Sequence, residues 1–323
     1  MKFLITGSSG HLGEALMRTL ANGPHEAIGV DIVPSPFTNV VGSIVDRAVV
    51  DRCMKGVDAV LHTATLHKPH VATHQRQAFV DTNITGTLNL LEASVVNGVR
   101  SFVFTSTTST FGDALTPPAG APAAWITEDV LPIPKNIYGA TKVAAEDLCQ
   151  LFHRYQKLPC LVLRTSRFFP EEDDVAEKRD AFEEANLKGN EFLYRRVDVA
   201  DVVSAHLLAV EKAASIGFGK FIITATTPFE RDDLEELGVD APAVLRRRVP
   251  TYEAIYAALG WKMLPALDRV YVNQRARAVL GWRPQYDFAH ILRNVSARQD
   301  PRSELAQAIG SKGYHPENRP ENL

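Results

Sequence analysis

The chain has 323 residues, of which 45% are apolar and 23% charged, and its formal net charge at pH 7 is −3. This length and composition predict one large core with a smaller attached lobe, and a charge this close to zero does not indicate a nucleic-acid partner. No apolar run approaches the roughly 18 residues that a membrane span needs. The three cysteines (Cys53, Cys149 and Cys160) have neither metal-site nor disulfide spacing, so we expect reduced thiols, no bound metal and a cytoplasmic protein.

A glycine-rich turn separates the first predicted strand from the first predicted helix. Lys2–Thr6 is a short apolar run typical of a strand, and Glu14–Asn22 has helical periodicity. Between them, Gly7, Gly10 and Gly13 follow a Gly-x-x-Gly-x-x-Gly spacing, which differs from the common Gly-x-Gly-x-x-Gly fingerprint. The order of strand, glycine turn and helix predicts a dinucleotide site with the diphosphate at the helix N-terminus; the alternative is a purely structural turn. The residues expected to contact the dinucleotide here are Gly7, Gly10, His11, Leu12 and Gly13.

The next predicted strand lies within Glu26–Asp31 and ends in an acid. Asp31 follows Gly13 by eighteen residues, close to the spacing at which an acid binds the adenosine ribose. A carboxylate accepts hydrogen bonds from both ribose hydroxyls and repels a 2′-phosphate, and no Arg or Lys follows until Arg47. We therefore predict NAD rather than NADP; the alternative is a surface acid in the turn before Pro34.

Strands and helices continue to alternate along the chain. The further expected strands are Ala59–Leu61, Phe102–Phe104, Cys160–Leu163 and Lys220–Thr224, and the expected helices are Thr82–Asn97, Tyr138–Gln156 and Asp198–Ala213. Such alternation predicts the α/β class, with a doubly wound parallel sheet of Rossmann-like type. Ligands in such sheets bind at the carboxyl ends of the strands.

Tyr138 and Lys142 form a Tyr-x-x-x-Lys pair, and a run of hydroxyl residues precedes them at Thr105–Thr110. A free Tyr has a pKa of about 10. A Lys one helical turn away lies on the same face and would lower the pKa of the Tyr toward neutrality, where it would act on an alcohol. Together with the glycine turn, the pair indicates a nicotinamide-dependent alcohol oxidoreductase; the alternative for Tyr138 is a surface residue at a helix start.

Several motifs between residues 6 and 284 resemble those of the extended short-chain dehydrogenase/reductases, also called the NAD-dependent epimerase/dehydratase family. The matching segments are Thr6-Gly7-x-x-Gly10-x-x-Gly13, His62-x-Ala64, Asn83-x-x-Gly86-Thr87-x-Asn89-Leu90-Leu91-Glu92-Ala93, Thr105-Ser106-Thr107, Phe111-Gly112, Tyr138-Gly139-x-x-Lys142, Leu163-Arg164 and Leu280-Gly281-Trp282-x-Pro284. The resemblance implies that Thr107 hydrogen-bonds the reacting substrate oxygen, that Tyr138 transfers its proton and that Lys142 binds the nicotinamide ribose. Ser106 or Thr108 is the alternative to Thr107.

The expected binding residues surround this catalytic set. NAD contacts are expected, besides the glycine turn, at Asp31, Ile32, Ser43, Ile44, Thr63, Ala64, Thr65, Asn83, Thr105, Tyr138, Lys142 and Ser166. Substrate contacts are expected at His67, Thr107, Thr108, Ser109 and Arg167. Ser43 departs from the Asp that family members commonly use to hold the adenine.

Other departures bear on the net reaction. Thr108-Ser109 stands where dehydratases of the family carry Asp-Glu, which argues against water loss. Arg167 stands where UDP-galactose-4-epimerase-like enzymes have Asn, and His67 stands where they have Lys, so a nucleotide on the substrate is in doubt. Arg195-Arg196 and Arg246–Arg248 are either further ligands for a diphosphate or carboxylate, or solvated surface.

Three functions stay open. The first is hydride transfer at a secondary alcohol of a carbohydrate-like substrate, by an epimerase or a dehydrogenase of sugars or nucleotide sugars. The second is a dehydrogenase or reductase of a small non-sugar hydroxy or keto compound. The third is a catalytically silent NAD-sensing protein, against which the intact Thr107, Tyr138 and Lys142 argue. The resemblance also implies a homodimer formed by the helices Thr82–Asn97 and Tyr138–Gln156.

The remaining segments complete the expected organisation. Residues 1–166 with 198–226 are expected to form the NAD-binding domain, 167–197 with 227–300 a smaller, mostly helical substrate lobe, and 301–323 a tail that is disordered or packs on a partner subunit. His67, His70 and His74 would share a helix face at the pocket mouth or in water rather than bind zinc. The acidic stretch Glu171–Glu184 is expected to be an exposed helix or lid, and the proline-rich 113–137 a loop.

Overall fold

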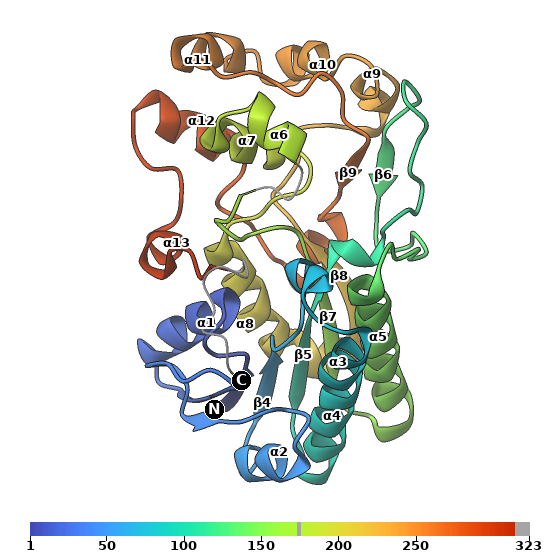
Figure 1. The fold of residues 1–323 in the computed structure, drawn as a ribbon, viewed down its shortest axis with the longest axis vertical. Helices are drawn as coiled ribbons and strands as arrows, with labels where there is room; N and C mark the ends of the chain where they lie inside the picture. The colour runs from blue at the N-terminus through green and yellow to red at the C-terminus, as the bar shows by residue number, and fades with distance from the viewer. Residues whose placement is uncertain (173–175, 314–323) are drawn as a thin grey trace.

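The protein has two lobes, one above the other (Figure 1). Their arrangement comes from a computed structural model that describes residues 1–172 and 176–313. The larger lobe holds a sheet with helices on both faces, and the smaller lobe is mostly helical. We keep the predicted domain boundaries as a proposal.

The main sheet has seven strands in the order β3-β2-β1-β4-β5-β7-β8. The strands are β1 (Lys2–Thr6), β2 (Glu26–Asp31), β3 (Val40–Val41), β4 (Ala59–His62), β5 (Ser101–Thr107), β7 (Cys160–Thr165) and β8 (Phe218–Ile223). Every neighbouring pair is parallel, which confirms the predicted doubly wound sheet. Strands β4 and β7 are buried at every residue, since helices cover both faces, and this explains their nearly continuous apolar sequences.

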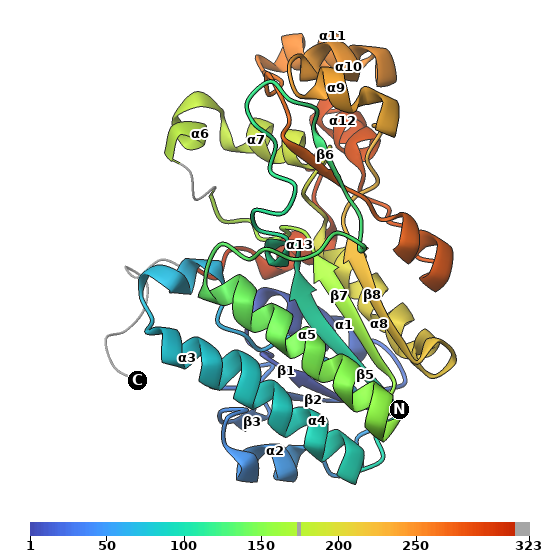
Figure 2. The same ribbon diagram turned by 90° about the vertical axis from the view of Figure 1, so that its right-hand side faces the viewer.

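Helices pack on the two faces of the sheet in separate layers (Figure 2). One layer contains α1 (His11–Ala21), α8 (Val199–Ile216) and α13 (Glu304–Ile309), and the other contains α2 (Arg47–Cys53), α4 (Gly86–Val96) and α5 (Ile137–Gln156). Each layer closes its own apolar core against one side of the strands. Among the helices that the structure describes, none has the length and apolar character needed to cross a bilayer.

The smaller lobe combines a short sheet with helices. Its elements are α6 (Ala176–Ala181), α7 (Glu184–Glu191), α9 (Leu234–Leu237), α10 (Ala241–Arg248), α11 (Tyr252–Leu259), α12 (Phe288–Ser296), β6 (Ala124–Ile126) and β9 (Arg269–Tyr271). Strand β6 corrects the expectation that 113–137 is entirely loop. The prolines lie outside β6, and Ala124 N–H donates to the Asp268 carbonyl at 2.8 Å, so a partner far away in sequence forms this strand.

The expected helix Thr82–Asn97 begins earlier than predicted. It runs from α3 (Arg76–Val80) through a π-helical turn at Asp81–Thr85 into α4. A π turn inserts an extra residue and changes which side chains face inward. Here it contains Asn83, which is 2% exposed and bonds Thr65 and Leu66 in the segment after β4.

The first part of the tail packs on its own chain. Helix α13 begins at the cap residue Ser303, whose hydroxyl accepts from Ala306 N–H at 3.0 Å. Ile309 is buried in the same apolar layer as α1 and α8. Residues 303–313 therefore make contacts within the chain, contrary to the expectation of disorder for this part of the tail, and packing on a partner stays a prediction; 314–323 lie outside the described residues.

Candidate active site

The glycine turn brings strand β1 and helix α1 into close contact. Gly7 has a φ of +72°, and a Cβ there would lie 2.8 Å from Ala64 Cα. A Cβ on Gly13 would lie only 1.9 Å from the Gly7 carbonyl oxygen. Glycine is therefore required at both positions, and backbone amides at the start of α1 are left accessible to an anion.

We expect Gly13→Ala to weaken NAD binding strongly. The added methyl group must displace backbone, and overpacking of this kind costs about 1–3 kcal/mol, or roughly tenfold or more in affinity if the turn moves. Isothermal titration with NAD would measure the effect. Gly23→Ala, at the other end of α1, is the matched control because its Cβ would meet nothing closer than 3.6 Å; equal NAD affinity in both variants would contradict the assigned role of the turn.

Thr6 and His62 fix the segment that follows β4. Thr6 Oγ1 lies 2.7 Å from His62 Nδ1 and accepts from the backbone N–H of Thr63 and of Ala64 at 3.2 and 3.1 Å. Burial lowers the pKa of His62 well below its usual value, so the ring is neutral. The predicted NAD residues Thr63 and Ala64 are thereby held beside Gly7, while Thr6 and His62, absent from the predicted set, do the positioning.

Asp31 lies at the end of β2, next to the glycine turn. Its carboxylate accepts from Ser9 N–H at 3.0 Å and from Val33 N–H at 2.9 Å. This fixes its orientation beside the turn, as an acid that binds ribose hydroxyls requires. The neighbouring Ile32 is 55% exposed, and its contact with NAD stays a prediction.

We expect Asp31→Ala to relax the preference for NAD over NADP. The change removes hydrogen bonds to a charged group, worth about 1.5–3 kcal/mol each, and the repulsion of a 2′-phosphate. The ratio of the dissociation constants for the two dinucleotides would report it, with the surface variant Asp51→Ala as control. An unchanged ratio would mean that Asp31 does not contact the ribose.

Ser43 and Ile44 follow β3 at the other end of the predicted NAD site. Ser43 Oγ accepts from Val45 N–H at 3.2 Å, and Asn89 Nδ2 donates to the Ile44 carbonyl at 3.1 Å. The Ile44 side chain is buried, and a Cβ on Gly86 would lie 2.6 Å from it. Ile44 therefore packs against α4 rather than standing free.

Asn83 connects the segment after β4 to helix α5. Its Oδ1 accepts from Thr65 Oγ1 and from Leu66 N–H, both at 2.9 Å, and its Nδ2 donates to Thr141 Oγ1 at 3.0 Å. Thr141 immediately precedes Lys142 on α5. The predicted NAD residues Thr65 and Asn83 are thus tied to the helix that carries the catalytic pair.

Thr107, Tyr138 and Lys142 come together at the carboxyl end of β5. Thr107 ends β5, Tyr138 lies in the first turn of α5, and Lys142 follows one turn later. The Thr107 and Tyr138 side chains are hydrogen-bonded, and Lys142 Nζ lies 4.0 Å from the centre of the Phe104 ring. All three predicted catalytic residues are buried and share one site.

The ionisation of this site differs from the expectation that Lys142 brings the pKa of Tyr138 toward neutrality. Burial raises the pKa of Tyr138 to about 12, although the Thr107 hydrogen bond acts in the opposite direction. Burial also lowers the pKa of Lys142 to about 7, against the attraction of Glu146. The same desolvation disfavours both charges, so the protein groups alone hold Tyr138 as a neutral phenol, and its ionisation requires further positive charge nearby.

A buried ion pair lies one turn below Lys142 on α5. Glu146 is fully buried; Arg164 Nη2 donates to it at 2.7 Å and Ser106 Oγ at 2.6 Å, and Lys220 Nζ lies 3.0 Å away. Burial opposes its ionisation, but Arg164 dominates the remaining interactions and keeps the pKa of Glu146 below its usual value. This network was missed from the sequence; its signal was a Glu four residues after Lys142 on the same helix face.

The predicted binding residues near the end of β5 are Thr105, Thr108 and Ser109, and their surroundings differ. Ser109 N–H donates to Thr107 Oγ1 at 3.0 Å, which places Thr108 and Ser109 beside the catalytic hydroxyl. Thr105, by contrast, has its Oγ1 2.8 Å from His206 Nε2, so its hydroxyl is directed to helix α8. Any contact of Thr105 with NAD would therefore come from its backbone.

His67 belongs to a cluster of rings rather than to a metal site. His67 precedes the short 3₁₀ helix Lys68–Ala72, His70 lies within it and His74 follows it. The His67 and His70 ring centres are 4.5 Å apart, and those of His70 and His74 are 4.9 Å apart. His67 also contacts Phe169, whose ring reaches His11 at 5.4 Å. Within 1–172 and 176–313 no group of His, Cys, Asp and Glu has the arrangement of a metal site.

The arginines considered as anion ligands have acidic or carbonyl partners within the protein. Arg167 Nη2 donates to the Glu171 and Glu172 carbonyls, and Arg195 and Arg196 pair with Glu191 at 2.5 and 2.7 Å. The three arginines at the end of α10 pair with acids as well: Arg246 with Glu253, Arg247 with Asp233 and Glu236, and Arg248 with Asp233 and Glu230. Arg246–Arg248 therefore have acidic partners within the small lobe.

NAD fits the residues at this edge of the sheet. The glycine turn is packed too closely for a Cβ at Gly7 or Gly13, as a turn that brings backbone amides to a diphosphate requires, and the acid Asp31 lies beside it. The buried Ser166 hydroxyl, at the end of β7, has no hydrogen-bond partner in the described part of the chain and is available to a ligand.

A sequence model described as the NAD dependent epimerase/dehydratase family matches residues 3–223. The chain belongs to this family. NAD is its cofactor, and the protein is an enzyme of the short-chain dehydrogenase/reductase superfamily.

Relatives of this family member have several activities. A UDP-glucose 4-epimerase of Rhizobium leguminosarum bv. trifolii is 27% identical over 336 residues, which cover 90% of this chain and 95% of that protein. A 3-beta-hydroxysteroid dehydrogenase of Mycolicibacterium neoaurum is 36% identical over 118 residues, which cover 33% of this chain and 32% of that protein.

Solved structures share the fold. A short-chain dehydrogenase/reductase superfamily protein from Agrobacterium tumefaciens with bound NAD has a TM-score of 0.66 at 23% identity, covering 95% of this chain and 99% of that one. UDP-glucose 4-epimerase from Thermotoga maritima, with UDP-glucose, has a TM-score of 0.64 at 23% identity, covering 92% and 98%.

Proposed function

We propose that this enzyme catalyses hydride transfer at a secondary alcohol of a carbohydrate-like substrate, as an epimerase or a dehydrogenase of sugars or nucleotide sugars. The observation that carries the proposal is the convergence of Thr107, Tyr138 and Lys142 at the carboxyl end of β5, in the same sheet whose strand β1 ends at the glycine turn. The full-length similarity to UDP-glucose 4-epimerases supports a carbohydrate substrate.

The protein groups divide the work of proton transfer and positioning. NAD, when bound, supplies the hydride acceptor and a positively charged ring. Thr107 hydrogen-bonds the substrate oxygen, and Tyr138 takes the proton from the alcohol or returns it to a ketone. Lys142 binds the nicotinamide ribose, and the positive charge of the nicotinamide would favour ionisation of the phenol.

Epimerase and dehydrogenase begin with the same oxidation and differ afterwards. An epimerase returns hydride to the opposite face of a retained ketone, whereas a dehydrogenase releases the ketone. Guanidinium groups commonly bind the diphosphate of a nucleotide, and Arg195 and Arg196 are already paired with Glu191. This pairing favours a substrate without a nucleotide and hence a dehydrogenase of a free sugar or sugar acid.

A small non-sugar hydroxy or keto compound is the second candidate substrate. The partial similarity to a 3-beta-hydroxysteroid dehydrogenase favours it, because that enzyme's name describes a secondary alcohol on an apolar skeleton. The catalytic residues would have the same roles in both cases.

A spectroscopic screen with NAD tests these functions. The panel contains free sugars, sugar acids, steroid alcohols and UDP-, GDP- and dTDP-sugars, with absorbance read at the NADH band and products separated by chromatography. Net NADH identifies a dehydrogenase and its substrate class. An isomerised nucleotide sugar without net NADH identifies an epimerase, and NAD binding without any turnover would favour the NAD-sensing alternative.

We also propose a homodimer formed through α4 and α5. Val96 on α4 is 79% exposed, and Leu151 and Tyr155 on α5 are 45% and 67% exposed, which leaves apolar side chains on this pair of helices in water. Light scattering after size-exclusion chromatography would give the mass, and Leu151→Glu would shift a dimer to monomer.

A further inference from the structure

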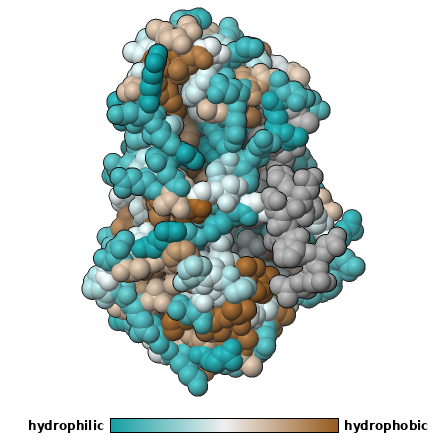
Figure 3. Space-filling view, turned by 60° about the vertical axis from the view of Figure 1, so that its left-hand side comes forward, coloured by the Kyte–Doolittle hydropathy of each residue, from teal (hydrophilic) through white to brown (hydrophobic). Residues whose placement is uncertain are grey.

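A cavity of about 410 Å³ lies between the two lobes on the α8 and α13 side of the molecule. Its wall comes from α7, α12, α13, the start of α8 and the segment after β7. Figure 3 shows this side of the molecule, with hydrophobic residues visible among hydrophilic ones near the junction of the lobes. The cavity is open to solvent and has the volume of a small-molecule site, so it is a candidate ligand site.

The wall is mainly apolar and partly aromatic. The side chains that would contact an occupant are those of Phe168, Phe192, Trp261, Ile291, Val295 and Ile309. They come from segments far apart in sequence, and no local pattern in the chain indicates the cavity. Such a surface stabilises rings and alkyl groups removed from water.

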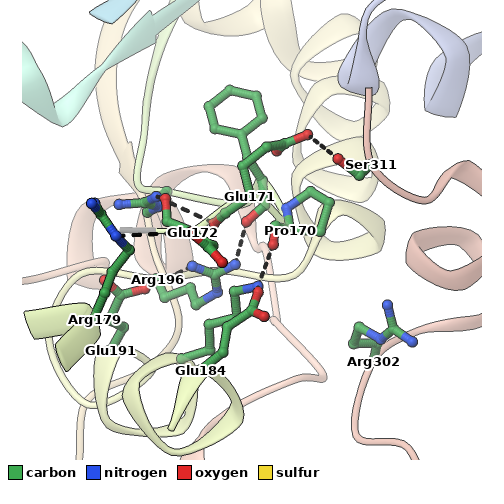
Figure 4. Close-up of polar contacts among 12 residues, drawn as sticks. Pro170, Glu171, Glu172, Arg179, Glu184, Glu191, Arg196, Arg302 and Ser311 are labelled. Carbon is green, nitrogen blue, oxygen red and sulfur yellow. Dashed lines mark hydrogen bonds and ion pairs between the residues drawn. The ribbon is translucent and has the colours of Figure 1, made fainter. Parts of the chain in front are cut away.

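The charged groups of the wall have partners within the protein. Arg302 pairs with Asp300 at 2.6 Å, Arg196 pairs with Glu191 at 2.7 Å, and Lys188 pairs with Glu184. Figure 4 shows Arg196 beside Glu191. It also shows Glu171, whose Oε1 accepts a hydrogen bond from Ser311 Oγ at 2.9 Å. A charged ligand would break such pairs, whereas an uncharged one leaves them intact.

The cavity is separate from the catalytic groups. Thr107, Tyr138 and Lys142 come from β5 and α5 and take no part in the wall, and of the predicted NAD residues only His11 does. His11 starts α1 and pairs with Glu171 at 3.2 Å. The cavity therefore borders the dinucleotide turn at one residue without including the reaction centre.

We propose that this cavity is a second ligand site, for an uncharged, mainly apolar small molecule that carries an aromatic or alicyclic ring. The site goes beyond the proposed hydride transfer and does not depend on it. Its volume lies in the range of about 300–1,000 Å³ that is typical of small-molecule sites.

Fluorescence titration with the neutral probe N-phenyl-1-naphthylamine tests the proposal on the full chain. We expect saturable binding at one site per chain. Ala185→Trp, on the exposed side of α7, and Ile291→Trp, on α12, place an indole in the cavity and are expected to weaken binding at least about tenfold. Ala185 is exposed, so its variant keeps the test valid if Ile291→Trp fails to fold.

Two variants serve as controls. Ala257→Trp adds the same indole at an exposed position of α11 outside the wall and should bind the probe as the wild type does. Tyr138→Phe should also bind it normally, even where turnover is lost, and so separates this site from the reaction centre. Binding that does not saturate, or equal affinity in the Ala185→Trp and Ala257→Trp variants, would overturn the proposal.

Discussion

Tyr138→Phe is expected to lower kcat by about 10²–10⁴-fold while leaving NAD affinity nearly unchanged. The substitution removes one hydroxyl from a buried ring and with it the hydrogen bond to Thr107, so the alcohol proton has no acceptor. The Phe ring retains the packing, and the glycine turn and Asp31 still bind the dinucleotide. Initial rates with the substrate found in the screen, together with NAD titration calorimetry, would measure the two effects separately.

Tyr155→Phe is the matched control for this variant. Tyr155 lies on the same helix, is 67% exposed and has no part in the candidate active site. The kcat of the Tyr155→Phe variant should therefore equal that of the wild type. Loss of NAD binding with preserved turnover in Tyr138→Phe would contradict the assigned role of Tyr138.

Arg164→Leu is expected to lower the free energy of unfolding by about 3–5 kcal/mol. Glu146 and Arg164 are 0% and 1% exposed, and Arg164 Nη2 donates to Glu146 Oε2 at 2.7 Å. Without the guanidinium, the carboxylate stays buried with Ser106 and Lys220 as its remaining partners, which is a costly environment for a charge. Urea denaturation followed by circular dichroism would give the free energy of unfolding.

The double variant Glu146→Leu/Arg164→Leu separates the ion pair from general packing. Removing both charges leaves no buried carboxylate, so the double variant should be more stable than Arg164→Leu alone. If Arg164→Leu lost less than about 1 kcal/mol, Lys220 would be sufficient to compensate Glu146, and the pair would not be essential to stability.

The sequence determined the fold class and predicted the catalytic set. Alternating apolar strands and amphipathic helices predicted the parallel sheet because each such segment buries a face of defined periodicity. The glycine spacing before α1 and the Tyr138-x-x-x-Lys142 pair are local patterns, and local patterns are visible in one chain. The acid at the end of β2 was predicted for the same reason, from its distance to the glycine turn.

Only the tertiary structure decided the features that depend on long-range pairing. Strand β6 exists because β9, far along the chain, pairs with it, and its proline-rich surroundings concealed it. Thr105 was expected at the ligand, yet its hydroxyl lies 2.8 Å from His206 Nε2, because the fold packs helix α8, 101 residues later in the chain, against this part of β5. The Glu146–Arg164 pair and the cavity between the lobes likewise join segments whose proximity no spacing in the sequence encodes. Tyr138 and Lys142 are buried only because the two helix layers and the sheet close around them. This burial shifts the pKa of both side chains.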